Sequence, residues 1–304
     1  MIIIPLVLSF DNNLVVPAGV CLSSLFVNSD KNTYYDIYIL HNNLSNSSKL
    51  LLSKLHDVFD CFEINYIDVG NAFDDGFEVR GITIAAYYRL LIPEVIIKYD
   101  KIIYSDVDVI FKEGLSEIYN KTHFNGEYVA AVKAVLLEEN DLNYIRSIGC
   151  EEYKYVNSGF LIFNSKLMRT DKIIDKFSKL VGNKYLYQDQ DIINIICKGR
   201  IKILPPRYTF SQGAYRYSNN FDYLKKIFTI DEINEAKEFG IVHYNGKKPW
   251  LCFCYRYHLW WLYYQNSIFM DDDFILKTEL DIIKRINYSI FDEFKMLIKR
   301  LIKR

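Results

Sequence analysis

The 304-residue sequence contains no Cys-x-x-Cys pair and no uninterrupted apolar run of membrane-spanning length. A transmembrane helix would need about 18 or more consecutive apolar residues. The apolar start at residues 1–8 is far shorter and lacks a basic leader, so we interpret it as a buried strand and not as a signal peptide. The 6 cysteines are scattered apart from Cys252 and Cys254, which disfavours a zinc or redox motif and favours buried thiols in a reducing compartment.

An excess of charge of one sign is also missing. The 37 Lys and Arg residues nearly balance the 38 Asp and Glu residues, so the formal net charge is -1. Binding nucleic acid over a whole surface requires a basic field, and we therefore expect no nucleic-acid partner. Half of the residues (50%) are hydrophobic, which excludes general disorder and allows a large core without disulfides.

Strand and helix patterns alternate along the first third of the chain. Short apolar runs predict strands at residues 2–10, 34–40, 62–69 and 101–105. Helical spacing between them predicts helices at residues 13–27, 45–59 and 81–92, the last ended by Pro93. This alternation predicts an α/β fold, with a mostly parallel sheet that helices cover on both faces.

The middle of the chain is less regular. Strands are predicted at residues 128–135, 159–164, 201–204 and 241–244, and helices at residues 170–181 and 189–197. No internal repeat and no flexible linker interrupts the pattern. We therefore predict one continuous domain over residues 1–257, followed by a C-terminal helical region over residues 258–304.

Acidic residues follow two of the predicted strands, where open parallel sheets bind ligands. Asp11 follows the first strand, and Asp106 and Asp108 follow the fourth. In an extended segment the two carboxylates lie on one side, with Val107 opposite. They repel each other unless a cation lies between them, and a hard divalent ion such as Mn²⁺ or Mg²⁺ could also bridge to a diphosphate. Spacing alone equally allows two solvated or capping aspartates.

Five short motifs are spread between residues 86 and 250. They are Ala86-Tyr87-Tyr88-Arg89-Leu90, Asp106-Val107-Asp108, Tyr155-Val156-Asn157-Ser158-Gly159-Phe160, Tyr187-Gln188-Asp189-Gln190-Asp191-Ile192-Ile193-Asn194 and His243-Tyr244-Asn245-Gly246-Lys247-Lys248-Pro249-Trp250. Together and in this order they resemble glycosyltransferase family 8, whose members are retaining enzymes with the Rossmann-like GT-A fold. The most similar functional type is the bacterial galactosyl- and glucosyltransferases that build lipopolysaccharide and other surface glycans.

The resemblance implies a role for each matching position. Asp106, Asp108 and His243 would hold Mn²⁺, with Mg²⁺ as the alternative, because two carboxylates and an imidazole suit manganese better than calcium. The residues implied to bind the UDP-sugar donor are Asp11, Asn13, Arg89, Asp106, Val107, Asp108, Asn157, Ser158, Gly246 and Lys248. The implied catalytic residues are Asp189, Gln190 and Asp191, with Gln190 beneath the reacting carbon.

These residues also have purely structural interpretations. His243 could be a half-buried histidine at a strand end, and Asp189 could cap the helix that follows it. Arg89 could pair with a carboxylate as scaffolding, and Gly246 could serve a turn. The last motif is one residue shorter between its His and its Lys than is common in the family. Either Lys247 or Lys248 could therefore contact phosphate, and we prefer Lys248 because it directly precedes Pro249-Trp250.

The end of the chain predicts an amphipathic helix from residue 290. Its apolar stripe consists of Phe291, Phe294, Leu297, Ile298, Leu301 and Ile302, and its cations are Lys295, Lys299, Arg300, Lys303 and Arg304. Such a helix fits an anionic membrane, although it could also pack on the protein with its cations favoured by the helix dipole. The aromatic residues between 255 and 264 fit either the core or a surface that stacks on an acceptor sugar.

These features predict a retaining, Mn²⁺-dependent hexosyltransferase that moves galactose or glucose from a UDP-sugar to a glycan or lipid-linked acceptor. We expect it in the cytoplasm, at the inner face of the membrane. Attack from the leaving-group side and double displacement through Asp189 or Asp191 are both open. The alternatives are a non-catalytic module that binds nucleotide sugars or glycans, and an Asp-x-Asp phosphatase, which would need Thr where Val109 stands.

Overall fold

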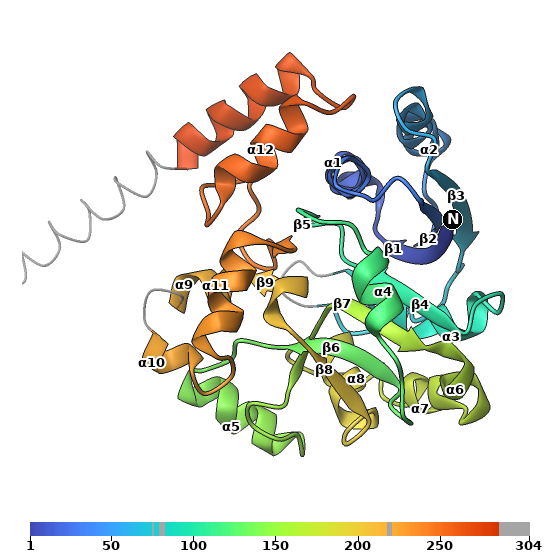
Figure 1. Ribbon diagram of the computed structural model, residues 1–304, viewed down its shortest axis with the longest axis vertical. Coiled ribbons are helices and arrows are strands. Elements are labelled where there is room, and N and C mark those ends of the chain that lie inside the picture. Colours follow the sequence, from blue (N-terminus) through green and yellow to red (C-terminus); the bar gives the residue numbers. More distant parts are fainter. Residues whose placement is uncertain (75, 79–82, 218–220, 286–304) are drawn as a thin grey trace, which may run out of the picture.

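The apolar runs of the sequence form a seven-stranded sheet in the computed structural model, which describes residues 1–74, 76–78, 83–217 and 221–285. Its strands are β1 (Ile2–Ser9), β2 (Thr33–His41), β3 (Phe62–Asp68), β4 (Lys101–Ser105), β6 (Val129–Lys133), β7 (Val156–Asn164) and β8 (Ile201–Leu204). Their order is β3-β2-β1-β4-β7-β6-β8 (Figure 1). Neighbours run parallel except around β7, which is antiparallel to both β4 and β6. The predicted mostly parallel sheet is confirmed.

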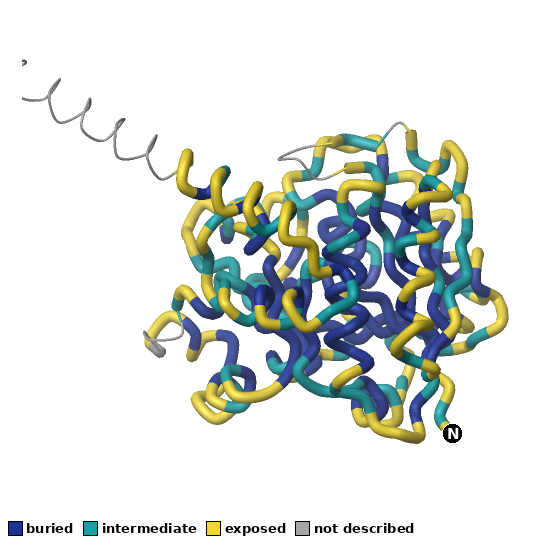
Figure 2. The backbone as a smooth tube through the Cα atoms, turned by 90° about the horizontal axis from the view of Figure 1, so that it is seen from above, coloured by how far each residue is buried: buried dark blue, intermediate teal, exposed yellow. Residues whose placement is uncertain are grey.

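Alternating side chains divide the interior into two main cores, one on each face of the sheet. On β1, Ile4, Leu6 and Leu8 enter one core, whereas Val7 enters the other. The first core includes side chains of α1 (Val15–Val27), α2 (Asn46–Ser53), α4 (Ser116–Lys121), α11 (Ile230–Glu238) and α12 (Tyr257–Gln265). The second includes side chains of η3 (Ile84–Leu91), α3 (Ile92–Val95), α6 (Ser165–Thr170), α7 (Ile173–Ser178) and α8 (Asp189–Ile196). The buried chain accordingly gathers in the middle of the molecule (Figure 2).

The remaining elements are short and lie mostly in the second half of the chain. They are η1 (Asn12–Leu14), η2 (Lys54–Asp57), β5 (Val109–Ile110), α5 (Glu139–Ser147), η4 (Pro206–Tyr208), β9 (Phe210–Ser211), α9 (Gln212–Tyr217), α10 (Phe221–Leu224) and β10 (Val242–His243). Strands β5, β10 and β9 form a second, three-stranded sheet. In it β10 is antiparallel to β5, with His243 opposite Val109. This pairing brings the His243 motif next to the Asp106-Val107-Asp108 segment.

Two predicted helices differ from those in the structure. Of the single helix predicted over residues 81–92, residues 81 and 82 lie outside the described residues; residues 84–91 form the 3₁₀ helix η3, the short α3 follows it, and Pro93 lies in the first turn of α3. Proline is tolerated there because the first turn of a helix has no intrahelical partner for its N–H. The helix predicted over residues 170–181 is the shorter α7, because the left-handed Lys172 (φ 50°) separates α7 from α6, which ends at Thr170.

Residues 260–269 pack against the first core. Trp260, Trp261 and Tyr264 of α12 are buried in the first core, and Gly19 of α1 makes room for Phe269, whose ring a Cβ at Gly19 would approach to 2.3 Å. Most of the aromatic run therefore belongs to the core, although Tyr255 is half exposed. Residues 272–285 are also helical.

The amphipathic helix predicted from residue 290 lies outside the described residues, and the domain boundary at residue 257 stays a prediction. Among the helices that the structure describes, none combines the length and the apolar character that crossing a membrane requires.

Candidate active site

Three predicted metal ligands meet where the two sheets adjoin. Asp106 and Asp108 follow β4, and the buried Val107 between them enters the core. His243 Nε2 of β10 lies 3.2 Å from Asp108 Oδ1 and 3.5 Å from Asp106 Oδ2. One ligand atom from each of the three residues lies within 4.8 Å of the others. The spacing deduced from the sequence therefore corresponds to a real cluster of two carboxylates and one imidazole.

Several ligand atoms of this cluster are left without a hydrogen bond. Among the described residues, the two His243 nitrogens and Asp108 Oδ1 are buried and make no hydrogen bond of good geometry, although His243 Nε2 and Asp108 Oδ1 lie 3.2 Å apart. Gly159 of β7 forms the floor, because a Cβ there would lie 2.2 Å from His243 Cε1 and 2.7 Å from Asp106 Oδ2. Buried polar atoms without partners are costly in a folded protein, and a bound cation would satisfy them. The residues present thus fit a divalent ion such as Mn²⁺.

The charges of the cluster shift one another's ionisation. Burial favours the neutral form of His243, but Asp108 and Asp106 outweigh it and raise the pKa of the imidazole to about 9. Burial also opposes ionisation of Asp108, yet Lys248 and His243 lower its pKa well below the usual range. The pKa of Asp106 is lowered in the same way, against its burial, by Arg89 and His243. Both carboxylates are therefore ionised at neutral pH, as metal ligands must be, whereas His243 is protonated between them and would have to release that proton to bind a metal.

Arg89 links the metal cluster to the predicted sugar site. Its buried guanidinium lies 2.9 Å from Asp106 Oδ1 and 3.1 Å from Asp189 Oδ2, and it donates to the Ser158 carbonyl at 2.6 Å. The same group lies over the Tyr104 ring, 4.4 Å from its centre, and the Tyr104 hydroxyl donates to Asp106 at 2.7 Å. Arg89 is thus a scaffold for the site as well as a cation within it.

The motif around Asp189 lies at the start of α8 and faces β7. Gln190 Oε1 accepts from Asn157 Nδ2 at 3.1 Å and from the Ser158 amide at 3.2 Å. Burial raises the pKa of Asp189 to about 6, although the neighbouring Arg89 opposes this shift. The structure therefore brings Asp189, Gln190 and Asn157 together, as the predicted sugar site requires.

Family membership follows from comparison with known proteins. Residues 5–254 match glycosyl transferase family 8. The chain belongs to this family. This finding confirms both the predicted family and the predicted class of enzyme, a glycosyltransferase.

Two curated bacterial relatives illustrate the match. A putative glycosyltransferase of Haemophilus influenzae is 29% identical over 211 residues, which is 68% of this chain and 63% of that protein. A lipopolysaccharide 1,2-glucosyltransferase of Escherichia coli is 26% identical over 254 residues, covering 79% of this chain and 71% of its own. The chain thus spans less than two thirds of the length of the Haemophilus protein.

Solved structures share the fold. The galactosyltransferase LgtC, in complex with donor and acceptor sugar analogs, superposes with a TM-score of 0.74 at 23% identity, over 90% of this chain and 100% of its own. The apo bifunctional glycosyltransferase WbbM gives a TM-score of 0.75 at 24% identity, over 92% of this chain and 52% of its own. The predicted GT-A fold is confirmed.

Lys248 and not Lys247 reaches the metal cluster of this family 8 protein. Its Nζ atom pairs with Asp108 Oδ2 and donates to the Tyr244 carbonyl at 2.8 Å. Lys247 and Gly246 are exposed, and the Lys247 carbonyl accepts from the side chain of Gln212. The geometry favours Lys248 as the cation beside a diphosphate, whereas donor binding by Gly246 stays a prediction.

Asp191 is engaged elsewhere. Its buried carboxylate accepts from the Tyr155 hydroxyl at 2.5 Å, from the Tyr144 hydroxyl at 2.7 Å and from the Tyr187 amide at 2.7 Å. These bonds hold the turn that leads into α8. A catalytic role for Asp191 would require the carboxylate to leave them.

The predicted nucleoside contacts Asp11 and Asn13 follow β1, next to β4 in the sheet. Asp11 Oδ1 accepts from the Asn13 amide at 2.9 Å and so caps the 3₁₀ turn η1. Between them, Asn12 Oδ1 accepts from the Ser45 amide at 2.9 Å and so ties this turn to the start of α2. The two predicted residues lie at the ligand-binding end of the sheet, and their contact with a nucleoside stays a prediction.

Tyr104 and Gly159 contribute to the site although the sequence analysis assigned them no role. Tyr104 precedes Asp106 by two residues on the same strand, so that their side chains point to the same face of the sheet. That spacing could have identified it. Gly159 belongs to one of the five family motifs, but the physical need for glycine there depends on His243, which approaches from another sheet.

Proposed function

We propose that this glycosyltransferase is a retaining, Mn²⁺-dependent hexosyltransferase. It would transfer galactose or glucose from a UDP-sugar donor. The observation that carries the proposal is the largely buried cluster of Asp106, Asp108 and His243, in which three ligand atoms make no hydrogen bond and which lies beside two cations, Arg89 and Lys248. A diphosphate bearing a sugar is the ligand that matches a divalent cation flanked by such residues.

Asp106, Asp108 and His243 would hold the metal. When bound, the ion would neutralise charge on the diphosphate as the glycosidic bond breaks. Lys248 would supply a further positive charge at the same leaving group, and Mg²⁺ could replace Mn²⁺ with less suitable ligands. Positive charge fixed where negative charge develops lowers the barrier, because the residues need no rearrangement during the reaction.

Gln190, Asn157 and Asp189 would orient the hexose. The bond between the anomeric carbon and the diphosphate oxygen breaks with its electron pair on oxygen, and the acceptor oxygen bonds to that carbon from the same face. The acceptor proton passes to a phosphate oxygen. Asp189 is paired with Arg89 and Asp191 with tyrosines, which favours this route over double displacement.

The acceptor that we propose is a glycan or a lipid-linked glycan, reached from the cytoplasm. The Escherichia coli relative is named for lipopolysaccharide, whose glycan is attached to lipid. The five cations of residues 295–304 beside an apolar stripe support contact with the anionic inner face of the membrane. Deleting residues 291–304 should release the protein from anionic liposomes and spare UDP-sugar hydrolysis. Equal liposome binding after deletion would refute the membrane contact.

A panel of UDP-sugars tests the central proposal. UDP release should occur with one UDP-hexose, require Mn²⁺ and stop in a chelator. An α-linked first product from an α-linked donor, identified by the NMR coupling of its anomeric proton, would support retention. Turnover that continues in the chelator would refute metal dependence, and a β-linked first product would refute retention.

A further inference from the structure

A strained backbone turn precedes Asp189 and Gln190. Gln188 has φ 48° and ψ -120°, and the Gln190 amide donates to the Tyr187 carbonyl at 3.0 Å, which closes a four-residue turn. Such angles at the second position are typical of a type II′ turn, where glycine is favoured because it has no Cβ. Glutamine is strained there, and strain of this kind persists where something else over-determines the conformation.

The Gln188 side chain makes a contact that glycine could not make. Gln188 is fully buried (0% exposed), and its Nε2 atom donates to the Phe77 carbonyl at 2.6 Å. The Tyr87 hydroxyl donates to the same carbonyl at 3.0 Å. The Phe77 carbonyl therefore accepts hydrogen bonds from both Gln188, which precedes Asp189, and Tyr87, which lies two residues before Arg89.

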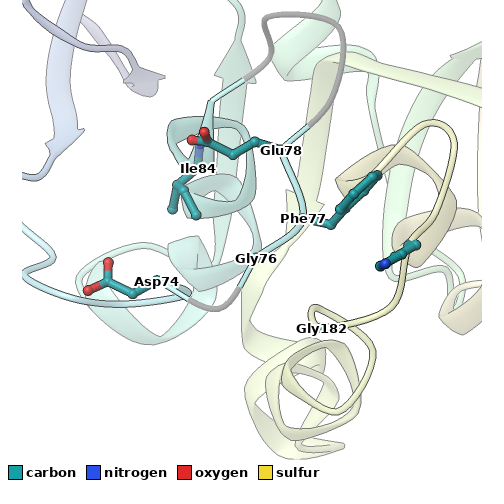
Figure 3. A pocket seen from close by; sticks show the side chains of 7 residues that line it. Asp74, Gly76, Phe77, Glu78, Ile84 and Gly182 are labelled. Carbon is teal, nitrogen blue, oxygen red and sulfur yellow. The ribbon is translucent and has the colours of Figure 1, made fainter.

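Segment 76–78 also lies close against Tyr87. A Cβ at Gly76 would come within 3.1 Å of the Tyr87 ring. The segment forms one wall of a hollow of about 520 Å³, which Figure 3 shows with Phe77 on one side and Gly182 on the other. The residues that line it are Asp74, Gly76, Phe77, Glu78, Ile84, Gly182 and Lys184. The bond from Gln188 thus connects this wall to the turn that presents Asp189 and Gln190.

We propose that Gln188 is a positioning residue for hexose transfer. Its strained backbone aims Asp189 and Gln190 at the sugar, and its amide holds segment 76–78 against that turn so that the geometry persists. The hydrogen bond from the Gln188 side chain to Phe77 explains why glutamine occupies a position whose backbone angles favour glycine. This inference rests on the proposed function, since it assigns the turn to the hexose and not to the nucleotide.

Two variants separate the backbone from the side chain. Gln188→Gly keeps the turn without strain and removes the amide, whereas Gln188→Glu keeps the size of the side chain and replaces the donor with a carboxylate oxygen, which cannot donate to Phe77. Both should lower kcat about tenfold, a typical consequence of a small misplacement. The Kd for UDP with Mn²⁺ should stay within about twofold of the wild-type value, because the proposed function assigns this turn to the hexose and not to uracil or the diphosphate.

Lys172→Gly is the matched control. Lys172 is another residue with positive φ (50°), it is exposed at the start of α7, and it makes no contact with the site residues described above. Relief of strain there should raise Tm slightly and leave kcat unchanged.

Hydrogen exchange provides a readout that does not depend on turnover. The Gly76 amide donates to the Phe73 carbonyl at 2.7 Å, and it should exchange several-fold faster in both Gln188 variants if the bond to Phe77 holds this segment. Wild-type kcat with unchanged Gly76 exchange would overturn the proposal, and so would a proportional loss of kcat and UDP affinity. If the wild-type protein transfers no hexose, the proposed function fails instead, and Gly76 exchange still decides whether Gln188 holds the segment.

Discussion

Asp36 and Asp108 are both buried aspartates close to the central sheet, but their surroundings are opposite. Asp36 Oδ2 accepts from Tyr99 at 2.6 Å, from Lys98 at 2.8 Å and from Tyr38 at 2.9 Å. Its Oδ1 accepts from Asn65 at 2.8 Å. Asp108 pairs with Lys248 through Oδ2, and its Oδ1 lies 3.2 Å from His243 Nε2 but accepts no hydrogen bond of good geometry among the described residues.

The difference separates a carboxylate that stabilises the fold from one that the fold holds ready for a ligand. Burial disfavours the charge of Asp36, but the bonds from Lys98, Tyr99 and Tyr38 outweigh burial and lower its pKa. Asp108 has two cationic neighbours, Lys248 and His243, but its Oδ1 accepts no hydrogen bond among the described residues, so a bound cation could still satisfy this oxygen. Changes at the two positions should therefore have opposite consequences for stability and activity.

The largest effect is expected at Asp108. Asp108→Asn removes one anionic ligand and should lower transfer by about 10³-fold or more, because several kcal/mol of charge stabilisation depend on the metal. The far-ultraviolet circular dichroism and the cooperative thermal transition should remain. Steady-state kinetics measures the loss of transfer, and Mn²⁺ titration by electron paramagnetic resonance measures the loss of Mn²⁺ affinity. Wild-type affinity for Mn²⁺ in this variant would remove Asp108 from the metal site.

Gly159→Ala tests the floor of the same cluster. The added Cβ would lie 2.2 Å from His243 Cε1, so the imidazole must move away from the carboxylates. We expect Mn²⁺ affinity to fall about 100-fold, the upper range for misorienting a metal ligand. Gly213→Ala is the control, since its Cβ would meet only ordinary contacts at 3.5 Å or more. Equal Mn²⁺ affinity in both variants would contradict the role of Gly159 as the floor of the metal site.

Asp36→Ala should affect stability and not catalysis. It leaves Tyr38, Tyr99 and Asn65 without their acceptor, and we expect the free energy of unfolding to fall by about 2–3 kcal/mol. Urea unfolding measures the loss, and kcat should be unchanged at a temperature where the variant is folded. A variant as stable as the wild type would mean that these hydrogen bonds make no net contribution to the free energy of unfolding. Asp36 would then no longer contrast with Asp108 as a carboxylate that stabilises the fold.

The smallest effect is a pH dependence. Because the folded pKa of Asp36 lies below its ordinary value of 3.8, its contribution to stability is present above that value and is lost as the pH falls through the folded pKa. We therefore expect part of the loss of stability between pH 5 and pH 2 to depend on Asp36. Urea unfolding at both pH values should show a smaller acid loss for Asp36→Asn than for the wild type. An identical loss would assign the acid sensitivity to other groups.

Local patterns predicted the strands well, because an apolar β-branched run is extended and buried wherever it lies in the sheet. They also predicted that Asp106 and Asp108 share one side of the chain, since that depends only on the period of an extended backbone. The helix predicted over residues 170–181 was wrong at its start, because the left-handed Lys172 separates α6 from α7 without a glycine or proline as a signal.

Other features depended on segments that meet only after folding. His243 lies beside Asp108 because the two-residue strands β5 and β10 pair, and strands so short have no detectable period. Asp36 carries no signal in its own strand, since its partners Asn65 and Lys98 come from elsewhere in the chain. The same holds for the tyrosines around Asp191 and for the strain at Gln188.

The sequence by itself determined the alternation of strands and helices, the family, and the residue types from which the site is built. Each of these depends on nearest neighbours or on motif order, which the linear chain contains in full. Only the tertiary structure decided which atoms are satisfied and which are left without a partner. Asp36 and Asp108 have the same side chain, and they differ because folding surrounds one with donors and leaves one oxygen of the other open to a cation.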